Sequence, residues 1–181
     1  MGTSTVTTTK WGIDASHSEV LFKVKHLMIS TVTGSFKEFG ADAELEGDDL
    51  TNASVRFWAS TASIFTNDEK RDGHLRSADF FDSERFPKLT FTSTRIEGSG
   101  SKWKVTGDLT IKDITKPVML DVEWSGMAKD PWGNTKAGLQ LSGRIDRKQW
   151  GLNWNAALET GGLLVSDEVR IVCEVQLAVQ G

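Results

Sequence analysis

Hydrophobic and polar residues alternate along most of the chain. The alternation is clearest in segment 103–111, where Trp103, Val105, Leu109 and Ile111 stand between polar residues. A period of two puts successive side chains on opposite faces of a β-strand, so one face is apolar and the other meets water. The same pattern marks eight predicted strands: 20–24, 30–45, 55–59, 89–92, 103–111, 118–124, 139–145 and 169–177.

Eight antiparallel strands that each bury one face are typical of a barrel or a sandwich. In the second strand the phase of the alternation changes between Phe36 and Phe39. This change predicts a bulge or bend that keeps both aromatic rings near one face.

Segment 66–81 interrupts the alternation and is predicted to be helical. The run from Thr66 to Glu69 resembles a capping box at a helix start, and Leu75, Ala78 and Phe81 recur at helical spacing. Phe80 and Phe81 make the end of this segment aromatic, so we expect the helix to plug or line an apolar space. A second interruption, 147–166, is predicted to be a long loop that carries apolar residues.

The size of the inward-facing residues bears on whether the interior is filled. The apolar faces mix phenylalanines with small residues, namely Ala59, Gly107, Gly126, Ala128, Ala137 and Gly143. An eight-stranded barrel is just wide enough either to be filled by side chains or to hold one small ligand. Small inward residues favour a cavity, whereas glycines that mark bulges beneath filling aromatics favour a packed interior. A cavity lined in this way would take a long apolar ligand, such as a lipid or an isoprenoid.

The length and composition fit one globular domain. The chain has 181 residues, of which 38% are hydrophobic and 25% charged, and we assign 11–181 to one domain after a flexible N-terminal tail at 1–10. A net charge of -4 argues against binding to nucleic acid or to anionic lipid surfaces, and no apolar run is long enough for an integral membrane segment. The polar first ten residues are not a secretion signal, so we expect a cytoplasmic location, or a periplasmic one if a signal peptide has been removed.

The candidate catalytic groups are few. His17, His26 and His74 lack the short spacings of metal sites, and no cofactor motif is present, so neither a metal nor a cofactor is predicted. Asp14 with His17 is interpreted as a loop-fixing pair or an acid–base pair. Asp72 with His74 is interpreted as exposed helix charge, or as an acid–base pair or a headgroup contact.

Several blocks together carry a resemblance to a known family. They cover most of residues 11–179, and the most specific is the run from Asp72 to Asp82 followed by Phe86-Pro87. The other blocks are 11–18, 20–26, 33–36, 62–64, 91–94, 105–111, 115–118, 145–151 and 166–171. In these the sequence resembles the YceI-like family of polyisoprenoid-binding, lipocalin-like bacterial proteins.

The resemblance implies an extended, eight-stranded antiparallel lipocalin-like barrel whose pore holds a polyisoprenoid lipid, an isoprenoid quinone or a polyprenyl phosphate. It implies binding, transport or storage without catalysis, in some cases under stress, and a homodimer. The alternatives are an enzyme that acts on the bound isoprenoid or quinone, and a stress-related interaction module with a packed interior.

The candidate ligand-binding residues combine the inward strand faces with the aromatic helix and three polar residues for a headgroup, His74, Arg76 and Arg147. They are Val20, Phe22, Val24, Phe36, Val55, Phe57, Ala59, His74, Arg76, Phe80, Phe81, Phe91, Leu109, Ile111, Leu120, Leu139, Leu141 and Arg147. Phe80 and Phe81 are expected to close one mouth of the barrel.

Overall fold

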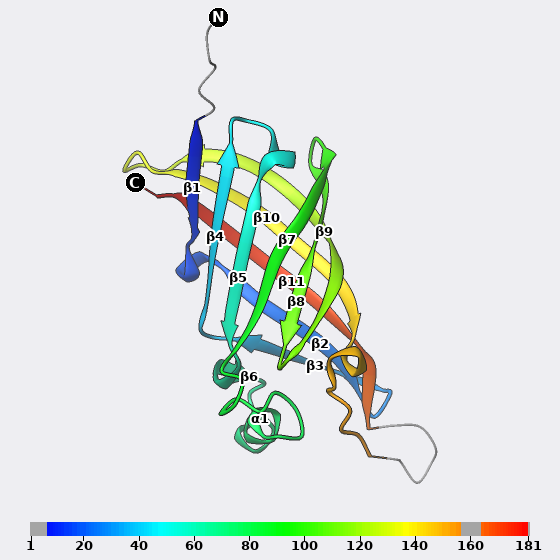
Figure 1. The fold of residues 1–181 in the computed structure, drawn as a ribbon. Coiled ribbons are helices and arrows are strands. Elements are labelled where there is room, and N and C mark those ends of the chain that lie inside the picture. Colours follow the sequence, from blue (N-terminus) through cyan, green and yellow to red (C-terminus); the bar gives the residue numbers. More distant parts are fainter. Residues whose placement is uncertain (1–6, 157–163, 181) are drawn as a thin grey trace, which may run out of the picture.

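The computed structural model describes residues 7–156 and 164–180, and almost all of them lie in or between antiparallel strands (Figure 1). The strands are β1 (Thr8–Ile13), β2 (Glu19–His26), β3 (Ser30–Phe36), β4 (Phe39–Glu46), β5 (Ser54–Ser60), β6 (Ile64–Phe65), β7 (Lys88–Ser99), β8 (Lys102–Ile111), β9 (Ile114–Lys129), β10 (Thr135–Asp146) and β11 (Val165–Val179). One helix, α1 (Glu69–Arg76), and four short 3-10 turns, η1 (Ala15–His17), η2 (Leu50–Asn52), η3 (Thr61–Ser63) and η4 (Arg147–Trp150), connect them.

Eight of the strands form a closed ring. The order is β1-β4-β5-β7-β8-β9-β10-β11, and β11 returns to β1 through pairs such as Trp11 with Val179. Every pairing is antiparallel. The predicted eight-stranded antiparallel barrel is therefore confirmed.

Three walls of the ring are long strands broken by a kink. β1 continues as β2 after η1, β3 continues as β4 after residues 37–38, and β5 continues as β6 after η3. The continuations pair in the same order: β2 lies on β11, β3 on β2 and β6 on β3. Two of the kinks lie side by side, because the Glu38 backbone N–H donates to Ser63 Oγ over 3.0 Å.

The predicted bend between Phe36 and Phe39 lies at the second of these kinks. Phe36 is buried, and the Phe39 ring packs on that of Phe57 with 6.4 Å between centroids. The first strand, in contrast, begins earlier than the domain boundary predicted at residue 11. Residues Thr8 to Lys10 belong to β1 and pair with β4, while 1–6 lie outside the described residues.

Helix α1 is shorter than the predicted segment and is capped differently. Its N-cap is Asp68, whose carboxylate accepts from the N–H groups of Lys70 and Arg71, so the proposed capping box at Thr66 is wrong. The helix ends at Arg76, and residues 77–86 form a series of turns that carries Phe80 and Phe81. In Figure 1, α1 lies at the lower end of the barrel, near β6.

The inward glycines do not create empty space, which corrects the sequence argument for a cavity. A Cβ at Gly107 would lie 2.4 Å from the Phe91 ring, and one at Gly143 would lie 2.5 Å from Leu120 Cδ2. Gly126 is half-exposed with a φ of 94°, Ala128 is exposed, and Ala59 is fully buried in the wall. The volume of any internal cavity must therefore come from the diameter of the eight-stranded ring.

Two apolar clusters pack inside the ring. The smaller one joins Trp11, Ala43, Leu45 and Ala137, near the β9–β10 turn. The larger one lies along the walls in the middle and at the α1 end. It includes Trp150, which is 1% exposed and donates its indole N–H to the Leu109 carbonyl at 2.9 Å. One end of the barrel is thus closed by side chains of the strands themselves.

The close approach of Phe91 to Gly107 predicts opposite effects for two glycine substitutions. Gly107→Ala should lower the free energy of unfolding by about 1–3 kcal/mol, because both an aromatic ring and the Thr92 carbonyl occupy the Cβ position. Gly73→Ala in α1 meets no atom within 4 Å and should raise it by about 0.5–1 kcal/mol. Denaturant unfolding of both variants measures this, and a stabilised Gly107→Ala would show that the interior is loosely packed there.

Candidate functional site

A cavity of about 640 Å³ occupies the interior of the barrel. Its walls are the inward-facing residues of the strands, from Trp11, Leu45 and Leu177 at one end to His26 and Val165 at the other. Such a volume lies within the range of small-molecule sites. Because nearly all of the lining side chains are hydrocarbon, the cavity suits an apolar chain and offers water few partners.

Sixteen of the eighteen candidate residues line this cavity. Of the other two, Ala59 is buried in the wall with 0% exposure, and Arg76 lies outside the lining. Other apolar residues line the cavity but are absent from the candidate set, among them Trp11, Val32, Leu45, Ile96, Val105, Val118, Trp154, Leu164 and Val165. The same alternation would have identified Val105 and Val118, whereas Trp154 and Leu164 lie in a segment without strand periodicity.

Polar lining residues gather at the α1 end. They are Lys25 and His26 at the end of β2, Thr66, Lys70, Arg71 and His74 around α1, and Arg147; Glu44 alone lies toward the other end. Most of these side chains are cationic or can become so. The cavity therefore has an apolar depth and a basic mouth.

His74 is held in a defined orientation at this mouth. Its Nε2 lies 2.8 Å from Asp79 Oδ2, and its ring packs edge-on against Trp154 and Phe80 with centroids 4.5 and 5.1 Å apart. Trp154 and Phe80 also contact each other. Phe80 and Phe81, in the turns after α1, thus line the cavity at its α1 end.

Arg147 is buried, although the sequence analysis placed it at a ligand headgroup. Its guanidinium donates to the carbonyls of Leu152, Trp154 and Ser166, the last two at 2.9 Å. Burial lowers the pKa of Arg147, and Asp167, 3.9 Å away, opposes that shift. The side chain fastens the segment after η4 to the start of β11, and its donors are used within the protein.

Asp72 also differs from its sequence interpretation as exposed helix charge. It is 4% exposed and accepts from both the backbone N–H and the hydroxyl of Thr66, at 2.8 and 2.6 Å. Arg71 donates to the Thr66 hydroxyl at 2.7 Å. Asp72 therefore joins α1 to the residue after β6.

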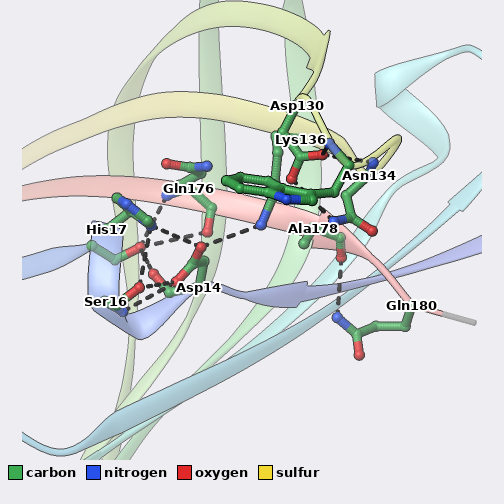
Figure 2. A network of polar contacts seen from close by, with 11 residues as sticks. Asp14, Ser16, His17, Asp130, Asn134, Lys136, Gln176, Ala178 and Gln180 are labelled. Atoms are coloured by element: carbon green, nitrogen blue, oxygen red, sulfur yellow. Dashed lines mark hydrogen bonds and ion pairs between the residues drawn. The ribbon is translucent and has the colours of Figure 1, made fainter.

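Asp14 and His17 lie outside the cavity lining, in a polar network at η1 (Figure 2). The Asp14 carboxylate accepts from Ser16 Oγ at 2.6 Å and lies 2.9 Å from His17 Nδ1 and 3.3 Å from Lys136 Nζ. These hydrogen bonds, that from Ser16 foremost, hold the pKa of Asp14 well below its usual range. The pair fixes the kink between β1 and β2, in agreement with the loop-fixing interpretation.

The remaining features considered are the single cysteine, possible metal ligands and possible membrane-spanning helices. Cys173 faces inward on β11 between Val20 and Leu141, and burial raises the pKa of its thiol to about 11, so it is uncharged at neutral pH. Within residues 7–156 and 164–180, no three His, Cys, Asp or Glu side chains are grouped to hold a metal ion. The helices among these residues include none that is long and apolar enough to span a bilayer.

Comparisons with known proteins agree with this geometry. A family model described as the YceI-like domain matches residues 11–177. A UPF0312 protein of Staphylococcus epidermidis is 41% identical over 174 residues, covering 94% of this chain and 98% of that protein. The crystal structure of a Campylobacter jejuni YceI protein covers 100% of this chain and 99% of that one, with 32% identity and a TM-score of 0.75.

A more distant structural neighbour shares the fold alone. It is a polyisoprenoid binding domain from Saccharophagus degradans, 14% identical, with a TM-score of 0.66 over 94% of this chain and 98% of that one.

Removing Arg147 should loosen the segment that it fastens. Arg147→Gln leaves buried carbonyls without donors, and we expect the free energy of unfolding to fall by about 2–4 kcal/mol. Arg144→Ala, at an exposed ion pair with Glu168, should change it by less than about 0.5 kcal/mol. Thermal unfolding of both variants tests this, and an Arg147→Gln protein as stable as the wild type would favour a headgroup role instead.

The Asp14 network predicts a pH dependence. Because the folded pKa lies below the ordinary value of 3.8, the ionised carboxylate stabilises the fold above about pH 4, and this contribution is lost as the pH falls further. Asp14→Asn should therefore have a lower Tm than the wild type at pH 7, and the difference should shrink below about pH 4. Calorimetry across this range measures it, and a constant difference would contradict the assignment.

Proposed function

This chain belongs to the YceI-like domain family, and from that premise we propose that it binds a long-chain polyisoprenoid inside its barrel without catalysing a reaction. The observation that carries the proposal is the cavity of about 640 Å³ with its hydrocarbon walls. The polyisoprenoid binding named for the Saccharophagus degradans neighbour supports the same ligand class.

Burial of the chain supplies the affinity. Each CH₂ group moved from water into an apolar site contributes about 0.8 kcal/mol, so a few isoprene units give a favourable binding energy without a charged contact. The smaller apolar cluster, which contains Trp11 and Leu45, forms the deep end of the lumen. The position of this cluster therefore limits the length of the isoprenoid chain that the barrel can hold.

The headgroup lies at the basic mouth in this proposal. Lys70 and His74 line the cavity there, and they replace Arg76 and Arg147 as the candidate headgroup contacts, because the Arg71 guanidinium donates to the hydroxyl and the carbonyl of Thr66. A quinone carbonyl can accept a hydrogen bond from these donors, and a polyprenyl phosphate can pair with their charge. Both headgroups stay candidates, and transport, storage under stress and homodimer formation stay predictions from the family.

The two alternatives differ in what they require. A packed interaction module is disfavoured by the open cavity. An enzyme needs an acid–base group that reaches the ligand, and Asp14 and Asp72 are occupied by structural hydrogen bonds, while His74 pairs with Asp79 at the mouth. We infer binding alone, and conversion of an added isoprenoid into a product would contradict this inference.

Extraction of the purified protein with organic solvent, followed by mass spectrometry, tests the proposal directly. A polyisoprenoid in stoichiometric amount, also present in native mass spectra of the intact protein, is the expected result and names the headgroup. A protein that is empty and takes up neither an added quinone nor a polyprenyl phosphate would overturn it.

Substitutions on opposite faces of β8 test the position of the ligand. Leu109→Asp places a charge in the hydrocarbon wall and should abolish binding of an added polyprenyl phosphate, whereas Lys104→Ala on the outer face should not affect it. Fluorescence titration with a labelled isoprenoid measures both affinities.

Val175→Trp covers the case in which the charged variant does not fold. It fills the lumen without adding charge, so it should bind short isoprenoids but lose the longest ones. Unchanged chain-length preference in folded Val175→Trp protein would show that the chain lies elsewhere.

A further inference from the structure

The turn between β2 and β3 exposes three consecutive large apolar side chains. Leu27, Met28 and Ile29, called here the apolar tip, are 38%, 62% and 83% exposed. The turn is closed by a hydrogen bond from the Ile29 N–H to the His26 carbonyl at 3.2 Å. Exposed apolar residues that are contiguous mark interaction sites more often than scattered ones do.

The backbone of the tip disfavours the residues that occupy it. Leu27 and Met28 have φ values of 55° and 61°, in the left-handed region where Gly and Asn are preferred in hairpin turns. Large side chains at both positions therefore cost folding stability.

A row of basic residues lies on the outer face of the same wall. Lys23 of β2 is paired with Arg170 of β11, which is paired with Arg144 of β10, and Lys25 lies two residues before the tip. Like charges directly opposite one another destabilise a sheet. Glu168 neutralises Arg144 at 3.5 Å, but no ion pair within 4.0 Å among the described side chains includes Lys23, Lys25 or Arg170.

The tip lies beside the basic mouth of the cavity. Lys25 and His26 line the cavity, His26 pairs with Val165, and the Leu27 N–H donates to the Leu164 carbonyl at 2.9 Å. The hairpin and α1 both lie toward the lower part of the barrel in Figure 1. An object that covered the tip would therefore meet the opening of the lumen.

We propose that the apolar tip and the basic row dock the mouth of the barrel on the surface of an anionic lipid bilayer. The three apolar side chains enter the acyl boundary, and Lys23, Lys25 and Arg170 attract the lipid phosphates. The membrane is favoured over a protein partner because the tip is a small apolar projection beside cations, which is the arrangement that interfacial anchors use. These cations make the surface beside the tip locally basic, in contrast to the net charge of -4 of the whole chain. The purpose of the docking, transfer of a chain between bilayer and lumen, rests on the proposed function; the docking itself does not.

Flotation of the protein with vesicles tests the docking without any isoprenoid. The wild type should float with vesicles of phosphatidylcholine and phosphatidylglycerol, and much less with phosphatidylcholine alone or at high salt. The double variant Leu27→Asn, Met28→Gly should bind the anionic vesicles with an affinity that is lower by a factor of about ten or more, because it removes two apolar side chains. A double variant that floats like the wild type would overturn the proposal.

Stability separates loss of docking from loss of folding. Asn and Gly suit the left-handed backbone of this turn, so the Tm of the double variant should rise, by about 2–4 °C for each kcal/mol gained. Trp132→Ala is the control at the opposite end of the barrel. Trp132 is 83% exposed and lies in the turn between β9 and β10, close in sequence to Lys136, which pairs with Ala178 near the end of β11. Its flotation should be unchanged, and loss of flotation in this variant alone would move the docking surface to that end.

Two further measurements distinguish the remaining outcomes. Val175→Trp, which shortens the lumen, should float like the wild type, so that loss of binding of the longest isoprenoids leaves the docking result intact. In a transfer assay from anionic vesicles, the double variant should load a fluorescent isoprenoid more slowly while binding it equally well from detergent. A wild type that does not float but sediments as a dimer, which the double variant abolishes, would assign the tip to a second copy of the chain and overturn docking.

Discussion

Closure of the strand ladder onto β11 is the constraint on which the rest of the structure depends. β11 has 15 residues, and one edge pairs with β10 along most of its length. The other edge takes β2 on its first part and β1 on its last. Once both edges are occupied, the alternation along every strand is fixed in space, and Val20, Cys173 and Leu141 lie in one inward row. The hydrocarbon lumen is thus a product of ring closure and a period of two.

Features that depend on residues close together in the chain could be predicted from the sequence. Alternation identified β2 to β5, β7 to β11 and most inward residues, because a period of two is set by strand geometry alone, but it missed β1 and the two-residue β6. It could not identify the burial of Arg147, whose acceptors lie 5 to 19 residues away, or that of Asp72, which bonds across the turn before α1. It also attributed the cavity to Gly107 and Gly143, because a one-dimensional pattern does not show that Phe91 and Leu120 cover them.

The two ends of the barrel have different chemistry. Trp11, Leu45 and Ala137 fill one end, whereas at the other the wall is completed by α1, the aromatic turns and the segment that Arg147 holds. The basic residues and the apolar tip lie at this second end. In the proposed function this asymmetry makes the second end the side of entry, and Asp72 and Arg147 hold that end together through their hydrogen bonds.

Because of the kinks in three neighbouring walls, we expect the two sides of the barrel to differ in how easily they open locally. β7 to β11 run unbroken, while the walls formed by β1 with β2, β3 with β4, and β5 with β6 are each interrupted. At the breaks the ladder is reduced to isolated bonds, such as those from the Lys37 N–H to the Ser63 carbonyl at 3.1 Å and from the Ser60 N–H to the Glu38 carbonyl at 2.8 Å. We therefore expect that side to open locally at lower free energy than the continuous side. In the proposed function, chains of different girth are then accommodated by movement of the interrupted walls, while β7 to β11 keep their shape.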